Sequence, residues 1–252
     1  MGWTHRERFL AALNLETPDR VPIDFGTTFA TTITLGAYDR LKAYLGLDHE
    51  TEVLSDINVL AAPHAAVLER FAVDTRRLSV GAFEGEQGWI DAESFRDEWG
   101  TLWRRAEGGP AMPVDGPFFD LEEPSIRDLE EHDWPDPDNP GYYRGLGERA
   151  QELRAKTDFA IVLSLPTMIV HEGQFLRGFA EWLKDLRRHR EFIDRMLAIT
   201  TEMMVRHIEN TFDAVGPNAD AVFTGDDLAS QAGPRMGPHR SRRPQRRPLS
   251  FR

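Results

Sequence analysis

The sequence predicts an α/β fold, a partial (β/α)8 TIM barrel of about the first four βα units with an inserted β-hairpin. Two observations lead to this prediction. Short apolar runs alternate with amphipathic helical segments along the chain, which is typical of βαβ units and a parallel sheet. Each apolar run also ends in a polar or Gly/Pro-containing loop, at Asp24, Gly81, Pro166 and Gly225. In a barrel, such loops at the carboxyl ends of the strands build the active site.

The first third of the chain is expected to alternate helices with two strands. Residues 4–15 form a helix that opens with a capping box, Thr4 followed three residues later by Glu7. Residues 21–25 form the first strand, where Pro22 stands near the start and its missing N–H matters least. The next expected elements are a helix at 38–45, a helix at 59–71 and the second strand at 76–80.

An aromatic segment then interrupts the βα pattern. Within residues 85–117, Trp89, Trp99 and Trp103 stand among charged residues, which predicts an inserted hairpin or small antiparallel element. The acidic, Pro-rich residues 118–140 are expected to connect it over the surface. The later expected elements are a short helix after Pro124, a helix at 143–153, a strand at 159–163, helices at 175–186 and 192–212, and a strand at 221–224.

Composition narrows the function classes. The 252 residues are 40% apolar, enough for a sizeable core, and carry a net charge of −12. The acidic surface argues against nucleic-acid binding, which needs clustered Lys and Arg. No apolar run approaches the length of about 20 residues that a membrane span needs, so we expect no membrane partner and a cytoplasmic location. The absence of Cys excludes disulfides, thiolate metal sites and a Cys nucleophile within this chain.

The sequence divides into residues 1–238, the part expected to form barrel units, and an Arg-rich tail at 239–252. The tail carries six Arg and no acidic residue, and the remaining 24 basic and 42 acidic residues give the first part a net charge of −18. Apolar periodicity vanishes across Pro244 and Pro248, so no helix is expected there. We hypothesise that the tail is a frame-shifted readout. The alternative is a non-catalytic binding module whose tail contacts RNA, acidic protein or lipid.

Five side chains near the expected strand ends could carry chemistry. Asp226 and Asp227 follow a predicted strand, where paired carboxylates suit proton transfer, a bound cation or a polar ligand. They could equally cap the following turn. His171 and Glu172 could form an acid/base pair, although Glu172 could instead serve the first turn of the next helix. Asp24 has the same two alternatives, with a loop-fixing hydrogen bond as its structural role.

Other polar or soft residues receive structural assignments. Met196, Met203 and Met204 lie within an apolar helical stripe and are expected in the core. The remaining His residues, His207 among them, show no metal-ligand spacing, so no metal site is predicted. The chain also lacks both common Gly-rich phosphate loops, which disfavours a nucleotide enzyme.

Four segments together resemble the uroporphyrinogen decarboxylase superfamily, and more narrowly its branch related to corrinoid-dependent methyltransferases. The segments are THRERFLAALNLETPDRVPIDFG, DEWGTLWRR, HEG and TGDDLASQAGP, in that order. The resemblance implies a (β/α)8 barrel whose cleft accepts a tetrapyrrole, a corrinoid or a methyl donor. By motif match it implies catalytic roles for Asp226, Asp227 and Glu172, and substrate contacts for Asp24, His171 and Gln231.

Three departures disfavour the decarboxylase activity itself. The superfamily's decarboxylases hold substrate carboxylates with Arg after the first strand, but residues 26–39 contain no Arg or Lys. Their second strand ends in a carboxylate that binds pyrrole N–H groups, whereas residues 78–81 carry none, and their Tyr near the Glu-Gly pair is matched by Ile169. Porphyrinogen decarboxylation in porphyrin biosynthesis is therefore the alternative, and methyl transfer is the preferred function.

The methyltransferase branch also implies a zinc ion, held by a His-x-Cys pair and a later Cys beyond the Gly-Asp-Asp strand. This chain contains no Cys, so no cofactor is assigned to it, although a full-length relative would use zinc and a corrinoid-binding partner protein. We expect this chain to be an impaired or inactive portion of such an enzyme.

Two expectations concern arrangement. Asp226, Asp227, Glu172 and Asp24 are expected to line one cleft, because a parallel barrel gathers the carboxyl ends of its strands on one side. Four βα units also leave an open sheet edge and an uncovered apolar face, so the chain is expected to fold poorly or to self-associate.

Overall fold

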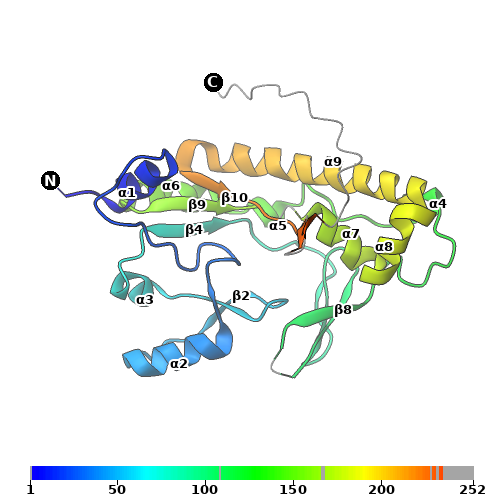
Figure 1. Ribbon diagram of the computed structural model, residues 1–252, viewed down its shortest axis with the longest axis horizontal. Helices are drawn as coiled ribbons and strands as arrows, with labels where there is room; N and C mark the ends of the chain where they lie inside the picture. The colour runs from blue at the N-terminus through cyan, green and yellow to red at the C-terminus, as the bar shows by residue number, and fades with distance from the viewer. Residues whose placement is uncertain (1, 108, 166–167, 228, 231–232, 235–252) are drawn as a thin grey trace.

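The computed structural model describes residues 2–107, 109–165, 168–227, 229–230 and 233–234, and its fold is α/β. A parallel sheet lies at its centre, with strands in the order β10 (Ala221–Phe223), β9 (Ala160–Ser164) and β4 (Thr75–Ser79) (Figure 1). The sequence prediction of an α/β fold with parallel strands is thus confirmed. The described residues form an open three-stranded sheet and no closed barrel.

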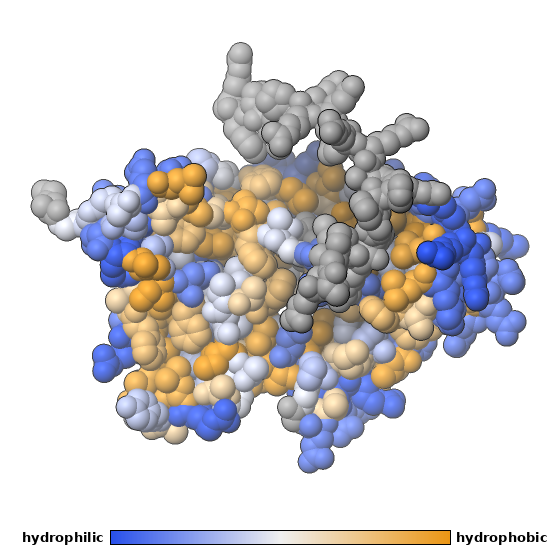
Figure 2. All heavy atoms as spheres, in the orientation of Figure 1, coloured by the Kyte–Doolittle hydropathy of each residue, from blue (hydrophilic) through white to orange (hydrophobic). Residues whose placement is uncertain are grey.

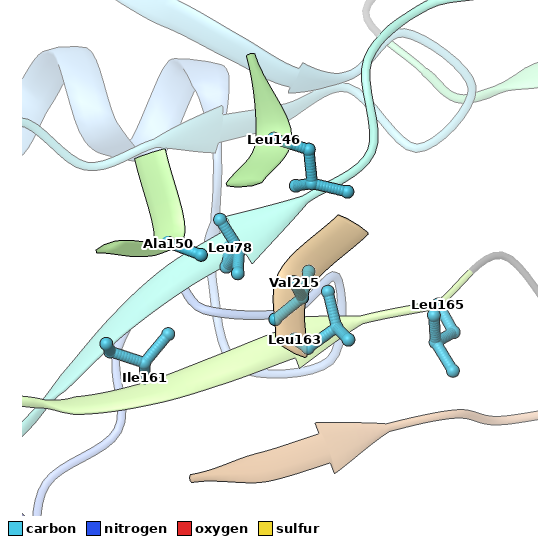
Figure 3. Packing of buried hydrophobic residues seen from close by; sticks show 7 residues of the cluster. All are labelled: Leu78, Leu146, Ala150, Ile161, Leu163, Leu165 and Val215. Atoms are coloured by element: carbon cyan, nitrogen blue, oxygen red, sulfur yellow. The ribbon is translucent and has the colours of Figure 1, made fainter. Parts of the chain in front are cut away.

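One face of this sheet is covered by α6 (Leu146–Lys156) and the long helix α9 (Arg190–Val215). The buried side chains between them come from the strands, the helices and the residue after β9 (Figure 3): Leu78, Leu146, Ala150, Ile161, Leu163, Leu165 and Val215. Burying each Leu or Ile side chain stabilises the fold by about 1.5–3 kcal/mol. This packing fixes the direction of β9 and β10, and hence the place where their carboxyl ends meet.

The amino-terminal helix α1 (His5–Leu13) has the capping box that the sequence predicts. Glu7 N–H donates to the Thr4 side chain, and the Glu7 carboxylate accepts from Thr4 N–H at 2.8 Å. Helix α1 packs against β4 and β9 at the amino end of the parallel sheet.

The predicted strand at residues 21–25 is wrong, because the structure has no strand there. Pro22 cannot donate to a ladder, and Ile23 N–H is taken by the carboxylate of Asp74 at 2.7 Å instead of a strand carbonyl. Ile23 O does accept one hydrogen bond from Asp74 N–H, at 2.8 Å. The segment therefore lies beside β4 without extending the sheet.

A separate three-stranded antiparallel sheet is formed by residues before β4. Strands β1 (Ile33–Thr34), β3 (Leu60–Ala62) and β2 (Glu52–Ser55) pair in that order beside α2 (Leu35–Leu45) and α3 (Ala65–Arg70).

The helix expected at 59–71 is only partly correct, because residues 60–62 form a strand and the helix begins at Ala65. Pro63 explains this, since it disfavours the helical conformation of Ala62 before it. The helix predicted at 38–45 is confirmed. It ends at Leu45 and is capped by Gly46, whose φ of 71° favours glycine because glycine has no Cβ.

The aromatic insertion is larger than a hairpin. It is a four-stranded antiparallel sheet of β5 (Gly88–Trp89), β6 (Ser94–Arg96), β7 (Leu102–Arg105) and β8 (Ala111–Asp115). Its central Trp103 is 1% exposed and donates its indole N–H to Asp97 at 2.7 Å. Trp103 also meets Phe175 edge to face, so the insertion is attached to the helix that follows β9.

The remaining described elements connect these layers. They are α4 (Ile126–Glu131), α5 (Pro140–Tyr143), α7 (Ile169–Arg177), α8 (Phe179–Arg188), a 3-10 turn (Gly216–Asn218), β11 (Ala229–Ser230) and β12 (Gly233–Pro234). Within the described ranges, no helix is long and apolar enough to cross a membrane.

Apolar side chains are exposed in the amino-terminal third of the chain. Val21 is 80% exposed, and Ile23, Phe29 and Phe71 are each exposed by about two fifths (40%, 41% and 43%). Figure 2 shows hydrophobic residues spread among hydrophilic ones over the left and centre of the face seen in Figure 1, and a dense group of hydrophilic residues at its right end. The self-association expected from the sequence stays a prediction, which sedimentation velocity would test.

Candidate functional site

Asp226 and His171 meet at the carboxyl end of the parallel sheet. Asp226 follows β10 by three residues, and His171 lies in the first turn of α7, after β9. Because β9 and β10 are parallel neighbours, the segments leaving them emerge at the same edge. The distance from Asp226 Oδ1 to His171 Nδ1 is 2.7 Å. The structure thus brings together two residues that are 55 positions apart.

Asp226 also caps α7. Its Oδ2 accepts a hydrogen bond from Val170 N–H at 2.6 Å, and its Oδ1 accepts from His171 N–H at 3.3 Å and from Asp227 N–H at 2.9 Å. A carboxylate in this place satisfies unpaired N–H groups and is favoured by the helix dipole. The capping and functional interpretations of Asp226 are therefore compatible, since the bonds that cap α7 also hold the carboxylate against the His171 ring.

The contact to Asp226 sets the chemistry of His171. Because an ionised carboxylate only accepts hydrogen bonds, Nδ1 carries the proton in the neutral ring and Nε2 carries the lone pair. His171 Nε2 lies 3.7 Å from Asp227 Oδ2, and the His171 side chain is 24% exposed. The ring can therefore take up a proton or receive a hydrogen bond at Nε2, with two carboxylates nearby to balance the imidazolium charge.

Glu172 lies in a different environment from its neighbour His171. It is 7% exposed and lines a partly open cavity of about 80 Å³. His171, Asp226 and Asp227 do not line that cavity. Burial raises the pKa of the Glu172 carboxyl well above its usual range, and the nearby charges of Asp97, Glu98 and Asp226 add to this. Its surroundings therefore favour the protonated form of Glu172, whereas the Asp226 contacts are those of an acceptor.

Asp24 is not brought to this edge. Its Oδ1 accepts hydrogen bonds from Thr27 Oγ1 and, at 2.8 Å, from Thr75 Oγ1. Thr75 is the first residue of β4, so Asp24 lies at the amino end of the sheet, opposite to Asp226. The expectation that Asp24 shares a cleft with Asp226 and Glu172 is corrected. It failed because residues 21–25 do not form the strand that would carry Asp24 to the other end.

Gln231 and the tail at 239–252 lie outside the described residues. The hypothesis that the tail forms a binding module therefore stays a prediction. Asp227 lies at the same edge as Asp226. Among the residues that the structure does describe, no group of three His, Cys, Asp or Glu side chains could hold a metal ion.

The structure adds residues to which the sequence analysis assigned no function. Glu98, Trp99, Tyr142 and His207 line the same cavity as Glu172. Burial raises the pKa of Glu98, and the charge of Asp97 adds to this. The resemblance did contain Glu98 and Trp99, within DEWGTLWRR, but adjacency in sequence gives no sign that they meet residues from α5, α7 and α9.

Two local devices place these cavity residues. The Asp97 carboxylate accepts hydrogen bonds from Trp99 N–H at 3.0 Å and Thr101 N–H at 2.9 Å, which folds the β6–β7 turn and directs Glu98 and Trp99. Gly81 N–H donates to Tyr142 O at 2.8 Å, and a Cβ on Gly81 would lie 2.3 Å from the Gly141 carbonyl oxygen. Glycine at 81 thus allows the close approach that positions Tyr142.

Comparison with solved structures finds similarity to a methyltransferase from Methanosarcina mazei, at 20% sequence identity and a TM-score of 0.51. The match covers 94% of this chain and 62% of that protein, so this chain spans less than two thirds of the length of its structural relative. No protein-family model and no curated protein matches the chain. At this identity the similarity shows a shared fold, so this chain has a fold like that of the methyltransferase.

Proposed function

We propose that this chain is part of an enzyme of the uroporphyrinogen decarboxylase superfamily, in the branch related to corrinoid-dependent methyltransferases. In this proposal the described elements correspond to the first βα units of a TIM barrel. Two independent observations support it: the order of the four sequence segments, and the fold shared with the methyltransferase from Methanosarcina mazei. The proposed reaction of the complete enzyme is methyl transfer.

The observation that carries the functional assignment is the 2.7 Å contact between His171 Nδ1 and Asp226 Oδ1 at the carboxyl end of the parallel sheet. Ligands of α/β proteins bind at this end of the strands, where loops collect polar groups. We propose that His171 Nε2 exchanges a proton or a hydrogen bond with a polar group of a corrinoid, tetrapyrrole or methyl-donor ligand. Asp226 orients the ring, and Asp227 adds charge beside Nε2.

The zinc chemistry implied by the resemblance does not fit this chain. The implied ligands are a His-x-Cys pair and a further Cys, and the sequence has no Cys to supply a thiolate. Zinc therefore has no part in the steps proposed for this chain. The residues of this chain that remain for the proposed reaction bind and orient a ligand and move a proton at His171.

Tetrapyrrole decarboxylation is the second candidate, because one feature favours it. A groove of about 520 Å³ runs along β4, within the size range of ligand sites, and is lined by Arg76, Arg77 and Arg149. Arg guanidinium groups suit the carboxylates of a porphyrinogen. Arg76 already has partners within the protein, because its guanidinium group stacks on Phe159 and donates to the carbonyl of Thr75. Arg77 is therefore the residue to test.

Ligand titrations with the purified full chain separate the two candidates. A saturable change in the absorption spectrum of methylcobalamin, weakened about tenfold or more in His171→Gln and Asp226→Asn, is expected for the methyltransferase proposal. Arg206→Gln, at a surface ion pair with Asp138, is the matched control and is expected to bind like the wild type. Binding of coproporphyrin that depends on Arg77, without corrinoid binding, would favour the decarboxylase. No binding of either ligand would contradict both.

A further inference from the structure

A cavity that is partly open to solvent lies where α5, α7, α9 and the β6–β7 turn meet. Its volume is about 80 Å³, several times the minimum of roughly 10–15 Å³ for one water molecule. Its walls include carboxyl, aromatic, thioether and imidazole side chains, from Glu98, Trp99, Tyr142, Glu172, Met204 and His207. The His171–Asp226 pair does not line it, so this space is distinct from the site proposed above.

Two carboxyl groups face this space without a cation to balance them. No ion pair within the described part of the chain involves Glu98 or Glu172. Burial raises the pKa of both, and the charge of Asp97 adds to this for each. Ionising two carboxyls in a shared, poorly solvated space is unfavourable unless a cation binds between them.

His207 supplies an independent sign of a ligand. It is 8% exposed, its Nδ1 lies 2.8 Å from Tyr143 Oη, and Tyr143 donates its only hydroxyl proton to the carbonyl of Pro137 at 2.5 Å. Nδ1 must then carry the imidazole proton and donate it to Tyr143, which leaves Nε2 as an acceptor. Nε2 is buried and has no hydrogen-bond partner among the described residues. A buried acceptor left unpaired costs about 1–3 kcal/mol.

The walls suit a positively charged organic group. Trp99 and Tyr142 line the cavity, and the faces of aromatic rings attract cations. Met203 and Met204 contribute soft, adaptable thioether surface that packs against methyl or methylene groups. The lining that the described residues provide contains no Lys or Arg to compete with a ligand cation.

We propose that this cavity binds a small organic ammonium ion. Glu98 and Glu172 balance its charge, Trp99 and Tyr142 pack against its carbon atoms, and His207 Nε2 accepts a hydrogen bond from its N–H. This inference goes beyond the proposed function, since it concerns a second binding site and assigns it no chemical step.

Three small probes test the proposal on the full chain by isothermal titration calorimetry. Trimethylammonium has one N–H, tetramethylammonium has none, and tert-butanol is a neutral molecule of similar size. We expect trimethylammonium to bind at least about tenfold more tightly than tert-butanol, because only the cation gains from the carboxylates and the aromatic faces. Glu98→Gln and Glu172→Gln are each expected to weaken trimethylammonium binding by a similar factor.

The variant His207→Phe examines the hydrogen bond separately. It is expected to abolish the preference for trimethylammonium over tetramethylammonium while leaving tetramethylammonium affinity near the wild-type value. Glu181→Gln, on the surface of α8, is the matched control and is expected to change neither affinity. Thermal unfolding of each variant confirms that it is folded, and the two Gln variants keep the test valid if His207→Phe does not fold.

Protons released on binding give a second readout. Ionisation of Glu98 or Glu172 around the cation releases protons, which calorimetry in two buffers of different ionisation enthalpy measures. The groups facing the cavity are Glu98 with Asp97 behind it, Tyr142, Glu172 and His207. Failure of wild type to bind either ammonium ion, or equal binding of tert-butanol, would overturn the proposal. Neither result would bear on corrinoid binding at His171 and Asp226.

Discussion

Two regions of this protein shield carboxyl groups from water, one beside Arg side chains and the other without them. At the amino end of β4, Asp74 is fully buried and is surrounded by hydrogen-bond donors, two of which are Arg guanidinium groups. It contacts His5 Nδ1 and Arg8 Nη1 at 2.7 Å and Arg20 Nη1 at 2.6 Å. In the cavity beside α7, Glu172 is buried and Glu98 is half-buried, both among aromatic and Met side chains. Neither has an Arg or Lys partner among the described residues.

The pKa values move in opposite directions as a result. Burial alone would raise the pKa of Asp74, but hydrogen bonds from Arg20, Ile23 N–H, His5 and Arg8 outweigh it and lower the pKa to about 2. In the cavity, burial raises the pKa values of Glu98 and Glu172, and neighbouring carboxylates add to the effect. Burial of a carboxyl group does not by itself predict the direction of its pKa shift. The groups around the carboxyl decide whether it stabilises the fold or is available to a ligand.

The strongest way to break this comparison is to remove the paired carboxylate. Asp74→Ala leaves Arg8 buried without that partner, and we expect the free energy of unfolding to fall by about 3–5 kcal/mol, as for other buried ion pairs that lose one member. Urea unfolding measures this. The control Asp194→Ala removes an exposed partner of Arg190 on α9 and should cost less than about 1 kcal/mol. Equal effects of the two changes would contradict the structural role of Asp74.

The cavity can be disturbed without touching its carboxyl groups, through Gly173 in α7. A Cβ at this position would lie 2.4 Å from the indole ring of Trp182 on α8, so Gly173→Ala forces the two helices apart and is expected to cost about 1–3 kcal/mol.

The matched control for this change is Gly36→Ala in α2. There the nearest atom to the new Cβ is the end of the flexible Arg40 side chain, at 3.8 Å. Removing a helical glycine should leave stability unchanged or raise it by up to about 1 kcal/mol. Comparing the two thermal transitions checks the prediction, and a neutral Gly173→Ala would mean that α7 and α8 are not packed as described.

The two regions should also give stability opposite dependences on pH. Asp74 has a lowered pKa, so its contribution is complete above the unfolded value of about 4 and is lost as pH falls toward about 2. Glu98 and Glu172 have raised pKa values, so folding takes up protons. Their contribution is complete below the unfolded value of about 4.3 and is lost as pH rises toward the folded values.

Urea unfolding over a pH series tests this prediction in the double variant Glu98→Gln/Glu172→Gln. The variant should lose the fall in stability above pH 4.3, which has a slope of about 1.4 kcal/mol per pH unit for each proton taken up on folding. It should keep the fall at low pH that Asp74 causes. An unchanged slope in the double variant would show that these carboxyls are not protonated in the folded chain.

The smallest expected effect concerns Asp226, whose carboxylate contacts backbone N–H groups and the His171 ring. Asp226→Ala removes the cap of α7, and thermal unfolding should show a loss of about 1 kcal/mol. Asp226→Asn retains one acceptor oxygen and should lose less. A loss as large as that of Asp74→Ala would indicate that Asp226 supports the fold beyond its capping of α7.

Local signals in the sequence were sufficient wherever neighbours along the chain make the structure. The capping box of Thr4 and Glu7, the stop at Gly46, the buried strand at 160–164 and the long helix at 190–215 all follow from periodicity and capping chemistry. The same signals failed at residues 21–25 and 59–71. There an apolar run resembled a strand or a helix, but Asp74 in one case and Pro63 in the other redirected the backbone.

By itself, then, the sequence determined the α/β class with parallel strands and the candidates His171, Glu172 and Asp226, because strand ends and helix starts are local features. Tertiary structure alone decided which candidates meet. It joined Asp226 to His171, sent Asp24 to the other end of the sheet, and placed Glu172 with Glu98 and His207 in one cavity. The physical reason is that hydrogen bonds and the electrostatics of burial depend on distance in space, which the order of residues does not give.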